Sequence, residues 1–347
     1  MLRRYLCCGA GFGDGDGRVA DEPEPECEKV DGGGDVVRQF SWSEIESVTS
    51  GFTSPVIGEG GFSTVYLGRL PGSPSPSAVK VHFSSERLHI AFRRELDVLL
   101  RLPRHPNVVR LIGFSDDQEE GALVFEYAPN GNLHDKLHGG GGRILGWAER
   151  VSIARQVAGA LDHLHERCGD LPVVHGDVKS ANVVLGAGHE ARLCDFGSAQ
   201  LGFAAAVARP ARAAVVGSPG YVDPHYLRSG LLTKGSDAYS FGVLLLELLT
   251  GAEAFSAGGA LTAAIGPKLL RSAGGGGGGG IGDLVDPRLG AEFDAEEAAE
   301  MVKLAAACVA GTPSLRPSMA EVVRAMEEKA CKSISAVRAR SNGKCNS

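Results

Sequence analysis

The feature that most constrains the fold is a change in hydrophobic pattern near residue 128. Before that point, short apolar or β-branched runs alternate with Gly and Pro clusters, which is typical of strands. The runs are Val56–Ile57, Thr64–Leu67, Ala78–Phe83, Val108–Phe114 and Ala122–Tyr127. One helical pattern interrupts them, carried by Ile90, Phe92, Leu96, Leu99 and Leu100. This half of the chain therefore predicts a small sheet with one helix.

After residue 128 the pattern is helical. Apolar residues recur at helical spacing, and one segment is apolar nearly all round, as in a buried helix. The expected helices are Trp147–His165, the buried segment Phe241–Leu249, Ala295–Val309 and Met319–Met326. A strand-rich half followed by a larger helical half predicts an α+β fold with two lobes, at residues 40–127 and 128–330.

Tails are expected at both ends. Residues 1–39 are rich in Gly, Pro and acidic residues and contain few apolar side chains, so they cannot offset their ordering entropy by burial. Structure is expected to begin near Phe40, followed by a helix at Ser43–Thr49 that Ser43 and Glu46 would cap. Residues 331–347 are expected to form a second disordered tail.

Composition narrows the function. The net charge of −7 argues against sequence-independent nucleic-acid binding, which needs a basic face. No apolar run reaches the ~18 residues of a spanning helix, and the start lacks the apolar stretch of a secretory signal. The eight cysteines form no Cys-x-x-Cys pair. We therefore expect a cytoplasmic protein with reduced thiols.

Two motifs in the first half suggest phosphate chemistry. Gly58-Glu59-Gly60-Gly61-Phe62-Ser63-Thr64-Val65 lies between two strand-like runs, which disfavours a dinucleotide fold or a Walker loop. Its glycines allow the backbone to approach phosphate oxygens, although a turn without a ligand is the plainer alternative. Lys80 lies in an apolar strand and needs a partner, for which Glu95 is the candidate. An exposed Lys and a solvated Glu remain the alternative.

A third motif follows in the helical half. It reads His175-Gly176-Asp177-Val178-Lys179-Ser180-Ala181-Asn182, and Asp195-Phe196-Gly197 comes after a predicted pair of short strands. Asp195 and Asn182 supply the hard oxygen ligands that Mg²⁺ prefers. Asp177 can accept a hydroxyl proton, and Lys179 can offset charge on a phosphoryl group in transfer.

Taken together, these motifs resemble those of the protein kinases, in the same order and with the same spacing. Further stretches are similar to plant receptor-like cytoplasmic kinases of the Pelle-like group. They are residues 58–62, 123–133, 237–243, 284–289 and 316–319. The resemblance implies a two-lobed kinase fold and Ser/Thr phosphotransfer from ATP with Mg²⁺, since Lys179 and Ser218 are typical of the serine/threonine class.

The resemblance also implies roles for individual residues. Asp177, Lys179, Lys80 and Glu95 would be catalytic, Asn182 and Asp195 would hold the metal, and Asp237 would brace the catalytic loop. Phe125 would be the gatekeeper beside the adenine hinge at Glu126–Ala128. The nucleotide contacts would be Ile57, Gly58, Glu59, Gly60, Gly61, Phe62, Ser63, Val65, Ala78, Lys80, Phe125, Glu126 and Ala128.

Four positions depart from the family pattern. Ser63 replaces the third glycine of the loop, and Gly176 stands where many kinases carry Arg. His225 replaces an acid that would pair with Arg316, which leaves the anchoring of this segment open. The run Gly274–Gly280 is inserted near the expected substrate-docking region. These changes keep a pseudokinase scaffold as the alternative to an active enzyme, whereas a small-molecule kinase is disfavoured by residues 217–227.

The resemblance implies protein substrates and a membrane receptor kinase as a possible partner. Cys7 and Cys8 follow Arg3 and Arg4, and adjacent cysteines near basic residues can be S-palmitoylated. Two acyl chains would anchor the chain at the plasma membrane. Two ordinary thiols in a disordered tail are the alternative.

Overall fold

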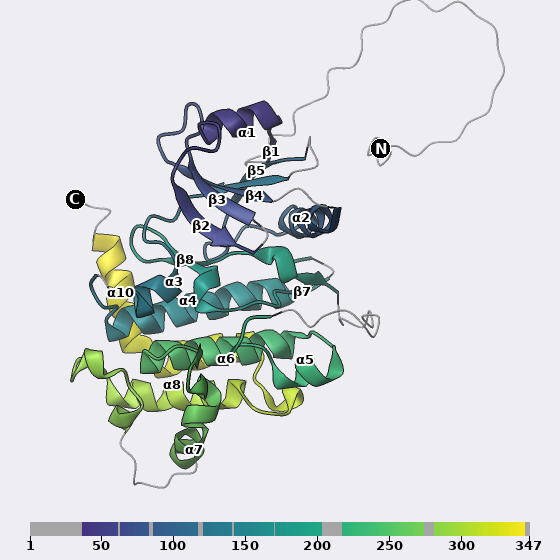
Figure 1. The fold of residues 1–347 in the computed structure, drawn as a ribbon. Coiled ribbons are helices and arrows are strands. Elements are labelled where there is room, and N and C mark those ends of the chain that lie inside the picture. The colour runs from purple at the N-terminus through teal and green to yellow at the C-terminus, as the bar shows by residue number, and fades with distance from the viewer. Residues whose placement is uncertain are drawn as a thin grey trace, which may run out of the picture. The chain divides into compact units, whose positions relative to one another are not determined.

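A computed structural model describes residues 37–61, 63–82, 86–116, 121–140, 142–169, 171–202, 217–273 and 281–343, and its amino-terminal part forms a six-stranded sheet (Figure 1). In spatial order the strands are β1 (Arg38–Gln39), β5 (Leu111–Ser115), β6 (Ala122–Glu126), β4 (Ser77–His82), β3 (Ser63–Gly68) and β2 (Val56–Gly60). Neighbouring strands are antiparallel, except that β1 pairs parallel with β5. Each of the five predicted runs overlaps one of these strands.

The first strand corrects the boundary expected at Phe40. Arg38 and Gln39 pair with Gly113 and Phe114, within the segment that the sequence assigned to a tail. The pairing depends on a glycine, because a Cβ at Gly113 would lie 2.2 Å from the Arg38 carbonyl oxygen. A strand of two residues is too short to produce a periodic pattern, so only the tertiary structure reveals it.

The helix α1 (Trp42–Val48) follows, with a different cap from the one predicted. The Ser41 hydroxyl accepts a hydrogen bond from the backbone N–H of Glu44, and the Glu44 carboxylate accepts one from the backbone N–H of Ser41. The Ser43–Glu46 cap is therefore wrong by two residues, because two overlapping Ser-x-x-Glu patterns occur in this sequence. Ile45 and Val48 are buried against the sheet, which fixes α1 to this lobe.

The helix α2 (Glu86–Leu99) lies beside β4 in the same lobe (Figure 1). Phe92, Leu96 and Leu99 are buried, as their spacing predicts. Ile90 and Leu100 were assigned to the same face but are 50% and 47% exposed. The apolar face of α2 is thus narrower than expected, because Ile90 and Leu100 lie outside it.

Helices form most of the second lobe. They are α3 (Leu133–His138), α4 (Trp147–Glu166), α5 (Pro224–Ser229), α6 (Lys234–Thr250), α7 (Leu261–Ala273), α8 (Ala295–Cys308), α9 (Met319–Lys329) and α10 (Cys331–Gly343). The four predicted helices correspond to α4, α6, α8 and α9. Short strands lie between them, at β7 (Val173–Val174), β8 (Val183–Leu185), β9 (Ala191–Leu193), β10 (Gln200–Leu201), β11 (Phe255–Ser256) and β12 (Gly259–Ala260). The predicted α+β organisation in two lobes is confirmed.

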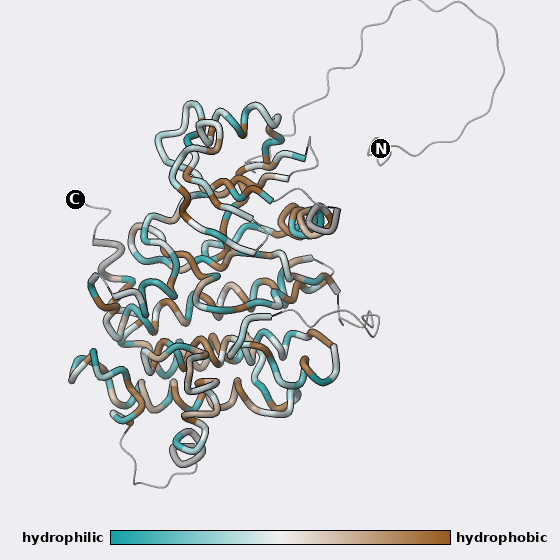
Figure 2. Tube along the Cα trace, viewed as in Figure 1, coloured by the Kyte–Doolittle hydropathy of each residue, from teal (hydrophilic) through white to brown (hydrophobic). Residues whose placement is uncertain are grey.

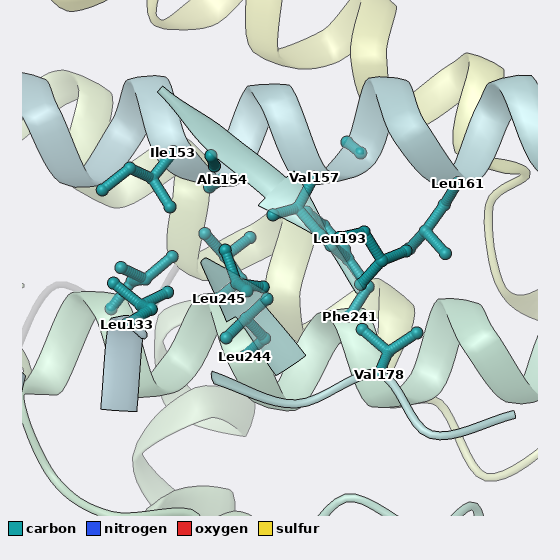
Figure 3. Packing of buried hydrophobic residues seen from close by; sticks show 14 of the residues in the cluster. Leu133, Ile153, Ala154, Val157, Leu161, Val178, Leu193, Phe241, Leu244 and Leu245 are labelled. Carbon is teal, nitrogen blue, oxygen red and sulfur yellow. The ribbon is translucent and has the colours of Figure 1, made fainter. Parts of the chain in front are cut away.

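The centre of this lobe is α6, which is buried from Ser236 to Leu249. Its track is predominantly hydrophobic in Figure 2, and Figure 3 shows Ile153 and Val157 of α4 pointing toward Leu244 and Leu245 of α6. Burial of a side chain of this size contributes about 1.5–3 kcal/mol. On another face, a Cβ at Gly242 would lie 2.6 Å from the Cys308 Cβ, so a glycine is needed for α8 to pack this closely.

The carboxyl-terminal helix α10 corrects the predicted tail at 331–347. It packs against α4, and Ser333 and Ile334 are buried. The buried Glu297 of α8 links α4 to α10. Its carboxylate accepts the Nε1–H of Trp147 on α4 at 3.0 Å and the backbone N–H of Ser333 on α10 at 3.2 Å. Tertiary contacts hold this largely polar helix, and such contacts leave no periodic signal in the sequence.

Several predicted features fall outside the described residues. They are Cys7 and Cys8, Phe62 and the glycine run 274–280. Residues 203–216 lie outside the described part of the chain as well. In the described part of the chain, no helix combines the length and the apolar character that crossing a bilayer requires.

Candidate active site

The glycine motif forms the hairpin between β2 and β3. Glu59 pairs with Thr64, and Gly60 pairs with Ser63. A Cβ added at Gly61 would meet nothing within 4 Å, and one at Gly58 would make only ordinary contact with Val65. The backbone of this hairpin is therefore accessible to a ligand, and the motif lies between two strands as predicted.

The predicted partner of Lys80 is correct. Lys80 on β4 donates to both oxygens of Glu95 on α2, at 2.8 Å each. It also donates to Asp195 Oδ1 at 2.8 Å. The side chain of Glu95 is 1% exposed, whereas that of Asp195 is 43% exposed. One ammonium group thus joins the sheet, α2 and the segment after β9, while the Asp195 side chain stays partly exposed to solvent.

The charges of the neighbouring side chains determine the protonation states of Lys80 and Asp195. Burial alone would disfavour the ammonium form, but the carboxylates of Glu95 and Asp195 hold the pKa of Lys80 above its ordinary value. Burial also opposes ionisation of Asp195, yet the Lys80 ammonium outweighs it and lowers the pKa of Asp195 to about 2. Lys80 is therefore a cation and Asp195 an anion across the physiological pH range.

The backbone at Asp195 is unusual. Its φ of 64° and ψ of 78° lie in the left-handed region, which L-residues other than Gly, Asn and Asp rarely adopt. This turn buries Phe196, which packs edge-on against His175 with ring centroids 5.0 Å apart. His175 also contacts the Cys194 carbonyl oxygen at 3.1 Å through Nε2. His175 therefore has a packing and hydrogen-bonding role beside Asp195.

The second group of predicted residues lies around Asp177. Lys179 Nζ is 2.7 Å from Asp177 Oδ2 and 2.8 Å from Ser218 Oγ. Ser218 in turn donates to Asp177 Oδ1 at 2.9 Å. Asn182 uses its amide nitrogen to donate to the Asp177 carbonyl at 2.9 Å and to its Oδ2 at 3.1 Å. Because both bonds use the nitrogen, the Asn182 amide oxygen is available to a metal ion.

Asp237 supports the loop that carries Asp177, as predicted. It lies in the first turn of α6 and is 1% exposed. Its carboxylate accepts the backbone N–H groups of His175 at 2.8 Å and Gly176 at 2.9 Å. His165 Nε2 on α4 contacts the same carboxylate at 2.9 Å. The loop is thus held to the two central helices of the lobe.

Gly176 has a structural reason to be glycine in this chain. Its φ of +79° is unfavourable for other residues, and an added Cβ would lie 2.9 Å from the Ser198 carbonyl oxygen and 2.8 Å from Leu232. The space beside the loop is thus filled by backbone and an apolar side chain. A phosphate-binding Arg at this position would have to displace them.

The structure corrects the expectation for Arg316. His225 was expected to leave it without its acid, but Asp223, two residues earlier, takes that place. Arg316 donates to both Asp223 oxygens at 2.8 Å, and the two side chains are 1% and 0% exposed. Ser236 Oγ adds a bond to Asp223 at 3.2 Å. The anchoring of this segment is therefore intact.

The predicted hinge residues lie at the edge between the lobes. Ala78 pairs with Phe125 across β4 and β6, and the Phe125 side chain is buried. The Glu126 side chain is bound to Arg192 Nε at 3.2 Å, so it points toward β9 and its backbone is the part that a ligand would meet. Cys194, beside Asp195, is partly buried, and desolvation raises the pKa of its thiol to about 12, consistent with a packing role.

Sequence reasoning missed the acids that support the site from the helical lobe. Asp223 was overlooked because its partner lies 93 residues away. Glu247 of α6 was overlooked because the surrounding segment is apolar, although an acid in a buried helix is itself a signal. It contacts Ser180 and Tyr221, which flank the Asp177 loop and the Ser218 segment.

The comparisons with known proteins agree with this geometry. The family model described as "Protein kinase domain" matches residues 53–326. The chain is 55% identical over 336 residues to the Salt tolerance receptor-like cytoplasmic kinase 1 of Oryza sativa subsp. japonica, covering 93% of this chain and 90% of that protein. It is 46% identical over 317 residues to a probable receptor-like protein kinase of Arabidopsis thaliana, covering 88% and 90%.

A probable LRR receptor-like serine/threonine-protein kinase of Arabidopsis thaliana is 38% identical over 295 residues, which cover 84% of this chain and 33% of that longer protein. The range matched by the family model includes both groups of residues, around Lys80 and around Asp177. The chain belongs to the protein kinase family, as a serine/threonine kinase related to the plant receptor-like cytoplasmic kinases.

Proposed function

We propose that this chain transfers the γ-phosphoryl group of ATP to Ser or Thr hydroxyls of protein substrates. The observation that carries the proposal is the contact set of Asp177, which holds Lys179, Ser218 and Asn182 within 3.1 Å of its carboxylate. A base, a cation and a metal-binding amide are thereby collected at one point. Protein kinases need this combination, because they catalyse transfer mainly by positioning and charge stabilisation.

The roles we assign follow from the chemistry of each group. Lys80, held by Glu95, would bind the α- and β-phosphates, and the hairpin Gly58–Val65 would cover them with its backbone. Asp177 would accept the proton of the substrate hydroxyl, and Lys179 would offset charge on the phosphoryl group. Mg²⁺, when bound, supplies charge neutralisation on the phosphates.

The residues fit that ion. The partly exposed Asp195 carboxylate and the free amide oxygen of Asn182 are hard oxygen donors, the kind Mg²⁺ selects. For the nucleotide we assign the remaining contacts to the residues that line the hairpin and the hinge. They are Ile57, Gly58, Glu59, Gly60, Gly61, Phe62, Ser63, Val65, Ala78, Phe125, Glu126 and Ala128.

A pseudokinase scaffold is the competing function. His225 had favoured it, but the pairing of Asp223 with Arg316 removes that argument. Gly176 is explained by local sterics and leaves the contacts of Asp177 unchanged. The complete set of charged groups therefore supports the enzyme over the scaffold.

The test is phosphotransfer by the purified chain with Mg-ATP and a generic protein substrate. We expect Asp177→Ala to lower the rate by about 10²–10⁴-fold, because it removes the general base. Asp97→Ala, which removes an exposed carboxylate on α2, should leave the rate unchanged. Mass spectrometry should place the phosphate on Ser or Thr. Nucleotide binding without transfer by the parent chain would favour the scaffold.

We further expect activity without phosphorylation of the activation segment. Between Gly197 and Gly217 the sequence offers one hydroxyl residue, Ser198, and Gly176 provides no Arg to receive a phosphate. Phosphatase treatment of the active chain should leave its rate unchanged, with phosphosites mapped before and after. A substantial loss of rate tied to a phosphate within residues 198–216 would contradict this expectation.

We also propose that S-acylation of Cys7 and Cys8 attaches the chain to the plasma membrane. There its partner would be a membrane receptor kinase. The similarity to receptor-like cytoplasmic kinases and the adjacent thiols next to Arg3 and Arg4 support it. Two acyl chains give stable binding where one does not. Replacing both cysteines with Ser should move the chain from the membrane fraction to the supernatant, and an unchanged distribution would refute the proposal.

A further inference from the structure

A buried acid lies beneath the loop that carries Asp177. Glu247 of α6 is 0% exposed. Its Oε1 atom accepts the Ser180 hydroxyl at 3.0 Å and lies 2.8 Å from His138 Nε2, and its Oε2 accepts the Tyr221 hydroxyl. These partners are two hydroxyls and an imidazole, none of which is a permanent cation. A buried carboxylate without a countercharge is costly, so this group calls for one.

A second imidazole is close to the same carboxylate. His134 lies one turn before His138 on α3, and the two rings have centroids 4.9 Å apart. Each of His134, His138 and Glu247 offers a ligand atom, and these atoms all lie within 4.8 Å of one another. Both histidines are partly buried, whereas Glu247 is fully buried.

The donor set defines the kind of ion. Two imidazoles and one carboxylate are common ligands of Zn²⁺, whereas Mg²⁺ prefers oxygen donors only. Around zinc the ligand atoms lie about 3.3 Å apart, given metal–ligand distances near 2.0 Å in a tetrahedron. To reach that spacing, the His138 Nε2 and Glu247 Oε1 atoms, now 2.8 Å apart, would have to separate slightly, and any pair near the 4.8 Å limit would have to approach. The nearby hydroxyls of Ser180 and Tyr221, or a water molecule, can complete the fourth position.

We propose that His134, His138 and Glu247 form a zinc-binding site, separate from the Mg-ATP site. The ion supplies the missing countercharge to Glu247 and cross-links α3 to α6. Through Ser180 and Tyr221 it also steadies the two segments that carry Asp177 and Ser218. Zinc is therefore expected to stabilise the fold of the helical lobe, whether or not phosphotransfer takes place.

The experiment compares the full chain with a His134→Asn variant after removal of metal by chelation. Among the described residues, the His134 side chain makes one long hydrogen-bond contact, at 3.5 Å to Ser180 Oγ, and one ring contact, with His138. This change should therefore leave the fold intact, as circular dichroism would verify. Titration with Zn²⁺ should show one fewer ion bound by His134→Asn, and likewise by His138→Gln. His225→Asn, on α5 and outside the cluster, should match the parent.

Two further measurements identify the type of ligand atoms and the effect of the ion on thermal stability. Co²⁺ in this site should give the visible bands of a tetrahedral nitrogen and oxygen environment, without the near-ultraviolet band of cobalt thiolates that binding to cysteines would give. Zinc at about 100 times its Kd should raise the Tm of the parent by about 4 °C, and that of His134→Asn by much less.

The proposed site and the proposed enzyme activity can fail independently. An Asp177→Asn variant should bind zinc like the parent, because that residue is not a ligand. Equal zinc stoichiometry and equal affinity in the parent, His134→Asn and His138→Gln would overturn the site. That result would leave the phosphotransfer proposal unaffected.

Discussion

An Asp223→Ala variant is expected to lower the free energy of unfolding by about 3–5 kcal/mol. The substitution leaves the Arg316 guanidinium in a site where its side chain is 1% exposed, without the carboxylate that accepts two of its hydrogen bonds. The Ala310 and Gly235 carbonyl oxygens still accept from Arg316, but they carry no full charge. Denaturant unfolding of the two proteins measures the difference.

The matched control is an ion pair at the surface. Lys234 and Glu166 lie 2.8 Å apart, with side chains 37% and 51% exposed. Glu166→Ala should therefore cost less than about 1 kcal/mol, because solvent replaces the lost partner. A loss at Asp223→Ala no larger than this control would show that the buried pair does not anchor the segment.

A His225→Glu variant tests the same conclusion from the other side. If Asp223 already satisfies Arg316, an additional acid at position 225 should bring no gain in stability. An increase above about 1 kcal/mol would mean that Arg316 still lacks a partner and that the pairing with Asp223 is incomplete.

We expect the kcat/KM for ATP of a Lys80→Met variant to be lower than that of the parent by about 10²–10³-fold. A loss of this size is typical when one positioned hydrogen-bond donor to the charge that develops in the transition state is removed. Lys80 is the one residue that contacts both Glu95 and Asp195 in the geometry described above, so its loss frees the metal-binding carboxylate as well. Initial rates at varied ATP concentration measure the effect.

Lys303→Met serves as the control for Lys80→Met, because its side chain is 54% exposed on α8 and far from the chemistry. Its rate should equal that of the parent. Circular dichroism should show that Lys80→Met is folded, since the buried Glu95 can take up a proton once its partner is gone. A folded Lys80→Met variant with full activity would exclude Lys80 from catalysis.

The sequence was sufficient to predict the parts of the site that lie in short motifs. Asp177, Lys179 and Asn182 are close in the chain, and their hydrogen bonds follow from that proximity. The pairing of Lys80 with Glu95 was also predictable, because a Lys in a buried strand needs a nearby acid. In each case the physical requirement and the candidate partner could be read from the sequence together.

Long-range pairs could not be predicted in this way. Asp223 meets Arg316 only because α5 and the segment before α9 converge on α6, and no periodicity encodes that convergence. The same holds for His138 and Glu247, which are 109 residues apart. The helix α10 escaped prediction for a related reason, since its stability comes from docking to α4 and α8 rather than from its own pattern.

The position of α6 has a consequence for redesign. This helix carries Asp237, which holds the loop of the base, and Ser240, which donates to the Tyr221 carbonyl at 2.8 Å and so holds the segment that follows Ser218. The loop that carries Asp177 and the segment that follows Ser218 are therefore both fixed to α6, so their positions depend on this one helix. In chimaeras that exchange surface helices, α6 is the piece to transplant whole, together with the residues that bind it.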